Sequence, residues 1–359
     1  MATQKTLFTN VIDFYNNLLD EIETADHVIS MMYYAFDHGE WAEKISKVLT
    51  AKASCGVRVR LMIDGIGQVL DNASHTLKNR TLVRELQKFG VDVEIFDPSR
   101  NHLTKLNRLH CKICAIDERV VFLGGSNIGD YYPTWDDTNL RLDGNLGNTF
   151  HEIFDFVRHF SRGQNPISSP YLDLSDLNVE DAQVLLTIPK QRRDIRRALL
   201  KLILDADKSI YIRTWYFLPD QEILGALRFQ AEKGTAVNVM LSHKTRVRPI
   251  DFANHNHIHS LVKSGGRVFR YTEKYMHAKV AWNNHGHVLI GSANLENRSL
   301  QNNFECCVLL RDKGLAATLQ RVFETDAQLS NQQTLEMFRN RLAPTNALSY
   351  ACNLVSPWL

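Results

Sequence analysis

Apolar residues along the first third of the chain follow two alternating patterns. Some segments repeat apolar positions every three or four residues, as amphipathic helices do, and others are short apolar runs typical of buried strands. Strands that alternate with helices predict an α/β fold, in which helices cover the faces of a mostly parallel sheet. Helices are predicted at residues 8–24, 41–53 and up to about residue 89, and strands at 27–36, 57–64 and 91–96.

The same succession returns after residues 161–170, a segment rich in Ser, Gly, Asn and Pro that predicts a domain boundary. The separation between matching landmarks decreases along the chain, as expected for one fold that occurs twice with shorter loops in the second copy. The matching landmarks are Ala25 and Ala206, Gly56 and Gly234, Gly90 and Gly266, and His110 and His277. We predict two pseudo-symmetric α/β/α sandwich halves side by side, at residues 1–160 and 191–342, with a linker at 161–190 and a C-terminal tail at 343–359.

Two short stretches carry the clearest repeat, because every position of the second keeps the spacing of the first. Each has a His and a Lys two positions apart, an acidic or amide residue five positions later, and a Gly-rich turn that ends in Asn. Because residues i and i+2 of a strand point to the same face, each His shares a face with its Lys, and the two stretches predict one composite site. The first comprises His110, Lys112, Asp117 and 124–127, and the second comprises His277, Lys279, Asn284 and 291–294.

A site with two imidazoles, two ammonium groups and two amides is suited to a phosphate group. Lys supplies positive charge, Asn supplies neutral donors, and hydroxyl and backbone N–H groups add hydrogen bonds. One imidazole can attack phosphorus while the other protonates the leaving oxygen, because an imidazole pKa of about 6.5 leaves both forms accessible. The predicted catalytic residues are His110, Lys112, His277, Lys279, Asn127 and Asn294, and the predicted phosphate-binding residues are Gly125, Ser126, Ser292 and Arg298.

An imidazole used in this way needs a partner, usually a carboxylate, on its second ring nitrogen. Two acidic residues are candidates, because Asp137 follows His110 at almost the same separation as Glu305 follows His277. We therefore expect Asp137 to orient His110 and Glu305 to orient His277, with Asp136 as a rival for the first position.

The doubled His-x-Lys-x4-Asp/Asn-x6-Gly-x-x-Asn pattern resembles the phospholipase D superfamily, and more narrowly the bacterial cardiolipin synthases. The resemblance runs from about residue 10 to residue 330 and includes the continuation from Arg298 to Glu305. It implies one composite active site at the interface of two halves, a covalent phosphohistidine and no metal or other cofactor. It also implies that His110 is the nucleophile, that His277 is the general acid and later the base, and that a phosphatidyl group passes to a glycerol hydroxyl of phosphatidylglycerol.

Two features depart from that family pattern. Asn284 stands where the family has Asp, but the resemblance gives this position and Asp117 a structural role, so activity is expected to survive. The chain also has no apolar run near the roughly 20 residues that span a bilayer, and its first residues predict no signal peptide. It is therefore predicted to be cytoplasmic and to reach its phospholipid substrate as a peripheral protein at the inner face of the membrane, with basic runs 190–197 and 244–248 as candidate lipid contacts.

Composition changes this interpretation little. The 44% hydrophobic and 23% charged content is ordinary for a globular protein. A net charge of +2 offers no general attraction for a polyanion, which disfavours nucleic acid as a partner. The six cysteines lack the density of a secreted disulfide scaffold and are predicted to be reduced. Because both motifs lie in one chain, a monomer is sufficient for a complete site.

Weaker motifs and other functions remain as alternatives. Cys111 and Cys114 have metal or redox spacing, but they interleave with the motif strand and lack a second pair. His255, His257 and His259 have no acidic partner nearby in sequence, and we expect a solvated helix end. The alternative functions are a phosphodiesterase that transfers the phosphoryl group to water, on phospholipid or nucleic acid, and a non-catalytic membrane-lipid binding module.

Overall fold

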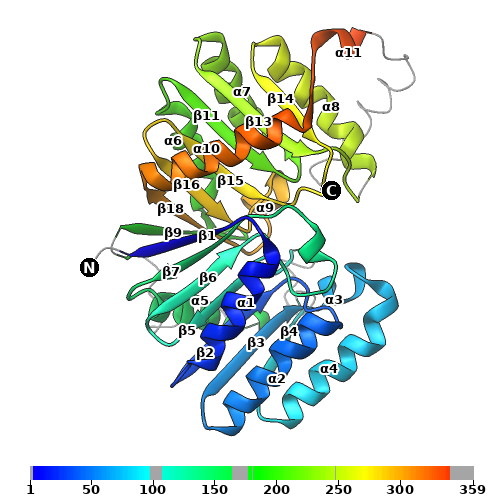
Figure 1. Cartoon of the computed structure of the whole chain (residues 1–359), viewed down its shortest axis with the longest axis vertical. Helices are drawn as coiled ribbons and strands as arrows, with labels where there is room; N and C mark the ends of the chain where they lie inside the picture. The colour runs from blue at the N-terminus through cyan, green and yellow to red at the C-terminus, as the bar shows by residue number, and fades with distance from the viewer. Residues whose placement is uncertain (1–2, 98–106, 164–176, 180, 247, 340–359) are drawn as a thin grey trace.

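The computed structural model describes residues 3–97, 107–163, 177–179, 181–246 and 248–339, and each half of this chain forms one large sheet (Figure 1). In the first sheet only β2–β3 and β3–β4 pair in parallel, so the prediction of a mostly parallel sheet is wrong. The tight turn between β5 and β6 cannot provide the crossover that a parallel pair needs. The strand order is β1 (Gln4–Phe8), β7 (Asn139–Asp143), β6 (Val120–Gly124), β5 (Ile113–Ile116), β2 (Val28–Tyr33), β3 (Arg58–Asp64) and β4 (Asp92–Phe96).

The second sheet repeats this order, which confirms the two-half architecture. Strand β9 lies within the predicted linker and pairs with β18, so the secondary structure of the second half begins before residue 191. Residues 164–176 of the predicted linker and the predicted tail lie outside the described residues. The equivalent strands are β9 (Ala182–Ile188), β18 (Glu305–Arg311), β16 (His287–Gly291), β15 (Lys279–Asn283), β11 (Ser209–Thr214), β13 (Ala236–Ser242) and β14 (Arg267–Tyr271); β10 (Arg192–Arg193), β19 (Ser330–Gln332) and β8 (Asn178–Val179) extend the sheet, and β12 (Phe217–Leu218) pairs with β17 (Leu295–Glu296).

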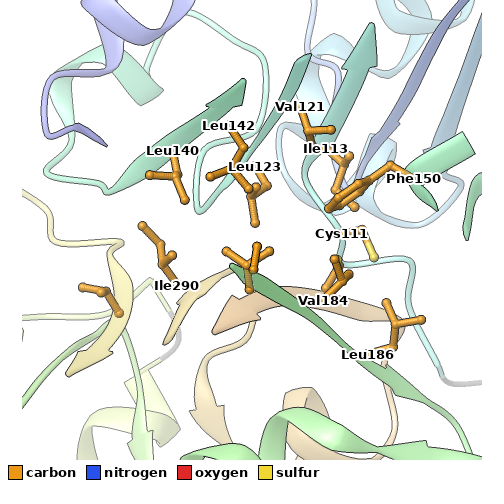
Figure 2. Packing of buried hydrophobic residues seen from close by; sticks show 14 of the residues in the cluster. Cys111, Ile113, Val121, Leu123, Leu140, Leu142, Phe150, Val184, Leu186 and Ile290 are labelled. Atoms are coloured by element: carbon orange, nitrogen blue, oxygen red, sulfur yellow. The ribbon is translucent and has the colours of Figure 1, made fainter. Parts of the chain in front are cut away.

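Helices cover the outer faces of both sheets, and a layer of apolar side chains between the two sheets joins the halves. Figure 2 shows Leu123 and Leu140 of the first sheet facing Val184 and Ile290 of the second, within one cluster that also includes side chains of α5 and α10. Burial of this shared apolar area stabilises the two halves as one body. The helices are α1 (Val11–Glu23), α2 (Glu40–Ser54), α3 (Gly67–Leu70), η1 (Ala73–His75), α4 (Thr76–Lys88), η3 (Tyr132–Thr134), α5 (Gly147–Ser161), α6 (Asp194–Leu204), α7 (Gln221–Glu232), α8 (Arg248–Lys263), α9 (Asn297–Gln301), α10 (Lys313–Gln328) and α11 (Leu335–Arg339).

Local sequence sets where several helices begin. Asn10, Asp220 and Asp312 stand just before α1, α7 and α10, and each side chain accepts a hydrogen bond from a backbone N–H of the first turn. Such caps satisfy donors that the helix itself leaves unpaired. Within the described ranges, no helix combines the length and apolar character needed to cross a membrane.

Asp117 and Asn284 hold equivalent turns in the two halves. The Asp117 carboxylate accepts hydrogen bonds from the backbone N–H groups of residues 26, 27 and 28, at 2.8–2.9 Å, where β2 begins. Burial alone would raise the pKa of Asp117, but these three donors hold it below its usual value. Asn284 Oδ1 accepts from residues 207, 208 and 209 in the same way, at 3.1–3.3 Å. One side-chain oxygen is enough for this role, which explains how an amide can replace the carboxylate.

Asn284→Asp is therefore expected to leave activity within about twofold of the original and to shift the unfolding temperature by no more than about 2 °C. The substituted carboxylate keeps the accepting oxygen. It loses the hydrogen bond that Asn284 Nδ2 donates to Asp207, but Asp207 is largely exposed and its repulsion is screened. Steady-state kinetics and thermal unfolding of the two chains measure both effects. A large loss of activity would show that the Asn284 amide does more than hold the turn.

Two short backbone contacts between the halves position the motif histidines. His110 N–H donates to the Phe304 carbonyl at 2.9 Å, and Leu109 and Phe304 form a parallel bridge. In the second contact, His277 N–H donates to the Asp136 carbonyl at 2.7 Å. Each histidine is thus held beside the residue that precedes the candidate carboxylate of the opposite half.

Candidate active site

The two histidines exchange their carboxylate partners between the halves. His110 Nδ1 lies 2.8 Å from Glu305 Oε1, and His277 Nδ1 lies 2.8 Å from Asp137 Oδ2. The expectation that each carboxylate serves the histidine of its own half is wrong, because the backbone contacts place each histidine next to the other half's strand. With a carboxylate accepting from Nδ1–H, the lone pair of each neutral ring lies on Nε2. Both imidazoles are therefore oriented as bases or nucleophiles.

Burial sets the charge state of these pairs. It lowers the pKa of His110 well below its usual value, and Lys112 and Lys279 lower it further. Burial also lowers the pKa of His277 well below its usual value, and the positive charge of Lys279 lowers it further. Burial raises the pKa of Asp137 to about 6 and that of Glu305 to about 8, so the carboxylate form of Glu305, which accepts from His110 Nδ1–H, becomes the main form as the pH rises past about 8. Both imidazoles are therefore neutral before substrate binds, and each can accept a proton or an electrophile at Nε2.

The two motif lysines are buried among the histidines. Burial lowers the pKa of Lys112 to about 8 and that of Lys279 to about 7. Each ammonium group donates to the carbonyl of the histidine two residues before it, at 2.7 Å for Lys112. A bound phosphate anion would raise the pKa of both lysines, because an opposite charge favours the charged form. The two lysines therefore make the site suited to bind an anion.

The asparagines of the two motifs, Asn127 and Asn294, are both buried. Asn127 Oδ1 accepts a hydrogen bond from Ala35 N–H at 3.2 Å, and the same side chain also hydrogen-bonds the Tyr132 hydroxyl. Asn294 Oδ1 has no hydrogen-bond partner among the described residues. A buried amide without a full set of partners is costly, and it is commonly completed by a ligand or an ordered water. An amide oxygen cannot accept a hydrogen bond from a phosphate anion, so a phosphate contact would need the Nδ2 groups, and phosphate contact by both asparagines stays a prediction.

The small residues of the Gly-rich turns lie against the carboxylates. Ser126 Oγ donates to Asp137 Oδ2 at 3.1 Å, and Ser292 Oγ donates to Glu305. Gly125 stands so close to Asp137 that an added Cβ would lie 2.0 Å from Oδ1. Both hydroxyls also have partners among their strand neighbours, Asn139 for Ser126 and Cys306 for Ser292. Phosphate binding by the three turn residues stays a prediction.

Gly125→Ala is expected to lower kcat by at least about 100-fold, because displacing the Asp137 carboxylate by an ångström misplaces His277. Gly225→Ala is the matched control, since a Cβ at Gly225 meets nothing within 4 Å. Single-turnover kinetics together with thermal unfolding separates a damaged site from a damaged fold. Full activity of Gly125→Ala would mean that the Asp137–His277 contact can be rebuilt or is dispensable.

Asp136, the rival carboxylate, has a different role. Its Oδ2 accepts from Arg213 Nη2 at 2.5 Å, and the same nitrogen lies 2.5 Å from Asp326 Oδ2. Arg213 is fully buried, so the two carboxylates provide the charge compensation that a buried guanidinium needs. Asp136 therefore belongs to a structural ion-pair group. The motif spacing gives no signal for Arg213, which lies on β11.

Aromatic side chains that the sequence analysis did not select surround the histidines. The Tyr34 ring centroid lies 5.4 Å from that of His110, and those of Trp215 and Trp135 lie 4.9 and 5.1 Å from that of His277. Tyr34 and Trp215 occupy equivalent positions, each directly after the first strand of the repeated pattern, so the repeat itself contained the signal. These rings exclude water and contribute to the burial that shifts the histidine pKa values.

Two arginines add positive potential to the site. Arg298 lowers the pKa of His110, although less than burial and the lysines do. Arg246 has a smaller effect of the same sign on His277, and its guanidinium lies 3.3 Å from Asp71 of the other half. Within the predicted basic run 190–197, Arg192, Arg196 and Arg197 pair with Asp194 and Asp220, which reduces their potential for lipid contact.

The weaker motifs do not form a second site in the described part of the chain. Cys111 and Cys114 belong to different apolar clusters on opposite faces of the first sheet. The rings of His255 and His259 lie 4.7 and 5.0 Å from that of Phe338. His255 and His257 are buried, so the expectation of a solvated helix end is wrong for these two, whereas His259 is exposed. No group of three or more His, Cys, Asp or Glu side chains among the described residues is arranged to hold a metal ion.

Paired sheets of this order with two His-x-Lys strands at their junction define a phospholipase D-type fold with a composite site. The sequence matches the family profile "Cardiolipin synthase, PLD-like domain" at residues 18–142 and 199–327. The chain therefore belongs to this family of the phospholipase D superfamily, which confirms the resemblance.

Curated relatives extend the similarity over the full chain. A cardiolipin synthase of Halalkalibacterium halodurans is 30% identical over 373 residues, which cover 100% of this chain and 73% of that protein. Cardiolipin synthase 1 of Bacillus anthracis is 32% identical over 378 residues, with 99% and 73% covered. Among solved structures, a phosphatidylserine synthase of Haemophilus influenzae superimposes with a TM-score of 0.77 at 15% identity, covering 99% of this chain and 95% of that chain, which supports the fold.

Proposed function

We propose that the chain is a phosphatidyltransferase of the cardiolipin-synthase type that needs no metal ion. The observation that carries the proposal is the reciprocal pairing of two histidines with carboxylates of the opposite half, beside two buried lysines. This arrangement supplies a nucleophile, an acid–base group and two anion-binding groups in one dry site. The curated relatives are named cardiolipin synthases, which supports a phospholipid substrate. We propose phosphatidylglycerol as that substrate and the inner face of the cell membrane as the place of action.

In the proposed first step, His110 Nε2 attacks the phosphorus of phosphatidylglycerol. The P–N bond forms as the P–O bond to glycerol breaks, and His277 gives a proton to the departing oxygen. His110 is the better nucleophile candidate because its side chain is 13% exposed, against 4% for His277. The bound phosphate itself raises the pKa of His277, so substrate binding favours the protonated acid that this step needs.

In the second step, the hydroxyl of another phosphatidylglycerol loses its proton to His277 and attacks the same phosphorus. The P–N bond breaks, and His110 is regenerated. Throughout, Glu305 accepts the Nδ1–H of His110 and stabilises the positive charge that the ring carries in the phosphohistidine. The lysines and asparagines are proposed to hold the phosphate oxygens. Hydrolysis is the second candidate, since water in the acceptor position completes the same chemistry.

Lipid analysis of the purified chain with phosphatidylglycerol vesicles tests this proposal. Cardiolipin and glycerol as products support the transferase, phosphatidic acid alone supports the hydrolase, and vesicle binding without turnover supports a lipid-binding module. EDTA is expected to leave the rate unchanged. Loss of activity on chelation, restored by zinc or magnesium, would contradict the metal-free mechanism.

A further inference from the structure

A group of exposed apolar side chains lies between the end of β3 and the first turn of α4. Ile66, Val69, Leu70 and Leu77 are 42%, 38%, 68% and 75% exposed, and all four belong to one short segment. Single exposed apolar residues are common, but a dense group of them marks an interaction surface. Ile95 is also 41% exposed.

This segment lies at the rim of the active site. Strand β3 ends at Asp64, whose carboxylate accepts a hydrogen bond from Leu109 N–H at 2.8 Å, directly before His110. Ligands of α/β sheets bind beyond the carboxyl ends of the parallel strands, which is where this segment starts. Farther along, Asp71 contacts Arg246 of the second half at 3.3 Å. The segment therefore reaches across the junction where the two histidines meet.

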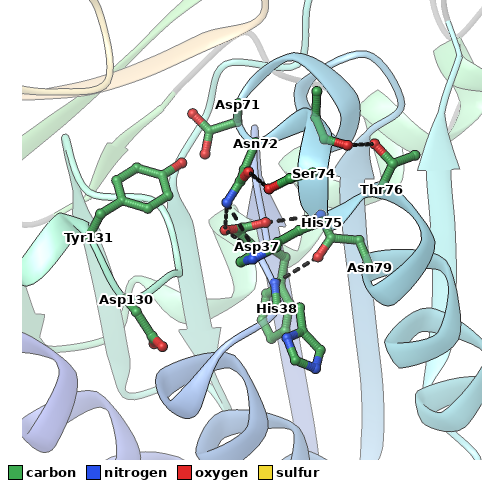
Figure 3. A network of polar contacts seen from close by, with 12 residues as sticks. Asp37, His38, Asp71, Asn72, Ser74, His75, Thr76, Asn79, Asp130 and Tyr131 are labelled. Atoms are coloured by element: carbon green, nitrogen blue, oxygen red, sulfur yellow. Dashed lines mark hydrogen bonds and ion pairs between the residues drawn. The ribbon is translucent and has the colours of Figure 1, made fainter.

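The polar side of the segment is tied down, which leaves its apolar side chains facing outward. Figure 3 shows Asn72, His75 and Asn79 converging on Asp37, which is only 2% exposed. The three contacts measure 3.2, 3.1 and 3.1 Å. Such a buried and satisfied network fixes the backbone, so exposure of the leucines is built into the fold.

Positive charge accompanies the apolar group. Lys78, Arg80 and Arg84 are exposed on α4, where Glu85 is the one exposed acidic residue; Asp71, before the helix, is paired with Arg246. A groove beside them is lined by Val69, Val83 and Ile95 together with the two arginines. Apolar side chains next to exposed cations match a bilayer that contains anionic lipid.

We propose that these apolar and basic side chains form a docking surface, which seats the enzyme on an anionic lipid bilayer with the mouth of the site against the headgroups. The choice of a phospholipid bilayer as the partner rests on the proposed function, because a phosphatidyl substrate resides in such a bilayer. The docking surface consists of Ile66, Val69, Leu70, Leu77, Lys78, Arg80, Arg84 and Ile95.

Flotation with vesicles of phosphatidylglycerol and phosphatidylcholine, compared with vesicles of phosphatidylcholine alone, tests the docking surface. Leu70→Glu combined with Leu77→Glu is expected to weaken binding to the anionic vesicles at least about tenfold. Lys78→Glu combined with Arg80→Glu is expected to weaken binding to the anionic vesicles and to reduce its salt dependence. Phe229→Glu is the matched control, because Phe229 is 56% exposed on α7 of the second half. Thermal unfolding confirms that each variant folds.

Wild-type vesicle binding by the folded Leu70→Glu/Leu77→Glu chain would overturn the proposal, and so would an equal loss in Phe229→Glu. A dimer that dissociates in the leucine variant while vesicle binding persists would assign the surface to a second copy instead. A wild-type chain that binds anionic vesicles through this surface but transfers no phosphatidyl group supports the docking proposal and contradicts the proposed function. The two failures are therefore distinguishable.

Discussion

Replacing His110 by alanine is expected to abolish turnover, with a loss of at least about 10⁴-fold in kcat. Removal of the ring removes the proposed nucleophile, and no neighbouring group can replace it. The nearby lysines are engaged with backbone carbonyls, and the four cysteines buried in the two sheets have thiol pKa values raised by burial. The measurement is phosphatidyl transfer under saturating substrate, with thermal unfolding as the check on folding.

His277→Ala is expected to separate the two steps of the reaction. A phosphodiester with a nitrophenolate leaving group needs no proton from His277, so it should still phosphorylate His110 and release a burst of nitrophenolate. Breakdown of the phosphoenzyme needs a base for the acceptor hydroxyl, so the covalent species should accumulate. A phosphoenzyme that accumulates in His110→Ala instead would invert the two roles.

The fold could be predicted from sequence where the signals are local. Apolar periodicity located α1, α2, β2 and β3, and the decreasing separation between matching landmarks revealed the duplication. Strands β1 and β9 were missed because each pairs with a strand distant in sequence. β1 opens the first half and pairs with β7 near its end, and β9 pairs with β18. Parallel pairing was overestimated because the periodicity of a strand does not encode the direction of its neighbour.

The site could be predicted as a set of residues but not as a set of pairs. The repeated motif spacing identified both histidines, and the structure places both with their lysines and carboxylates in one buried cluster. The sequence assigned each carboxylate to the wrong histidine, because proximity in sequence favours a partner in the same half. The pairing across the halves depends on Phe304 and Asp136, whose carbonyls hold the histidine backbones of the opposite half. Tertiary contacts of this kind leave no periodic signal.

Pairing of each histidine with a carboxylate of the opposite half predicts a result that pairing within each half does not. Glu305→Gln is expected to slow phosphorylation of His110 by roughly 10²- to 10⁴-fold. The amide would put a donor either against the Ser292 hydroxyl or against His110 Nδ1, and the second arrangement favours the tautomer whose Nε2 is protonated and cannot attack.

The decisive measurement is the burst of nitrophenolate in the His277→Ala background. If Glu305 serves His110, adding Glu305→Gln to His277→Ala slows the burst as strongly as it does in the chain that keeps His277, because the affected histidine is still present. Asp137→Asn added to His277→Ala should change the burst little, since its partner imidazole is already gone. Pairing within each half predicts the reverse: Asp137→Asn would slow the burst and Glu305→Gln would not. Equal slowing by Glu305→Gln with and without His277 means that Glu305 and His277 are not coupled, as expected if Glu305 serves His110.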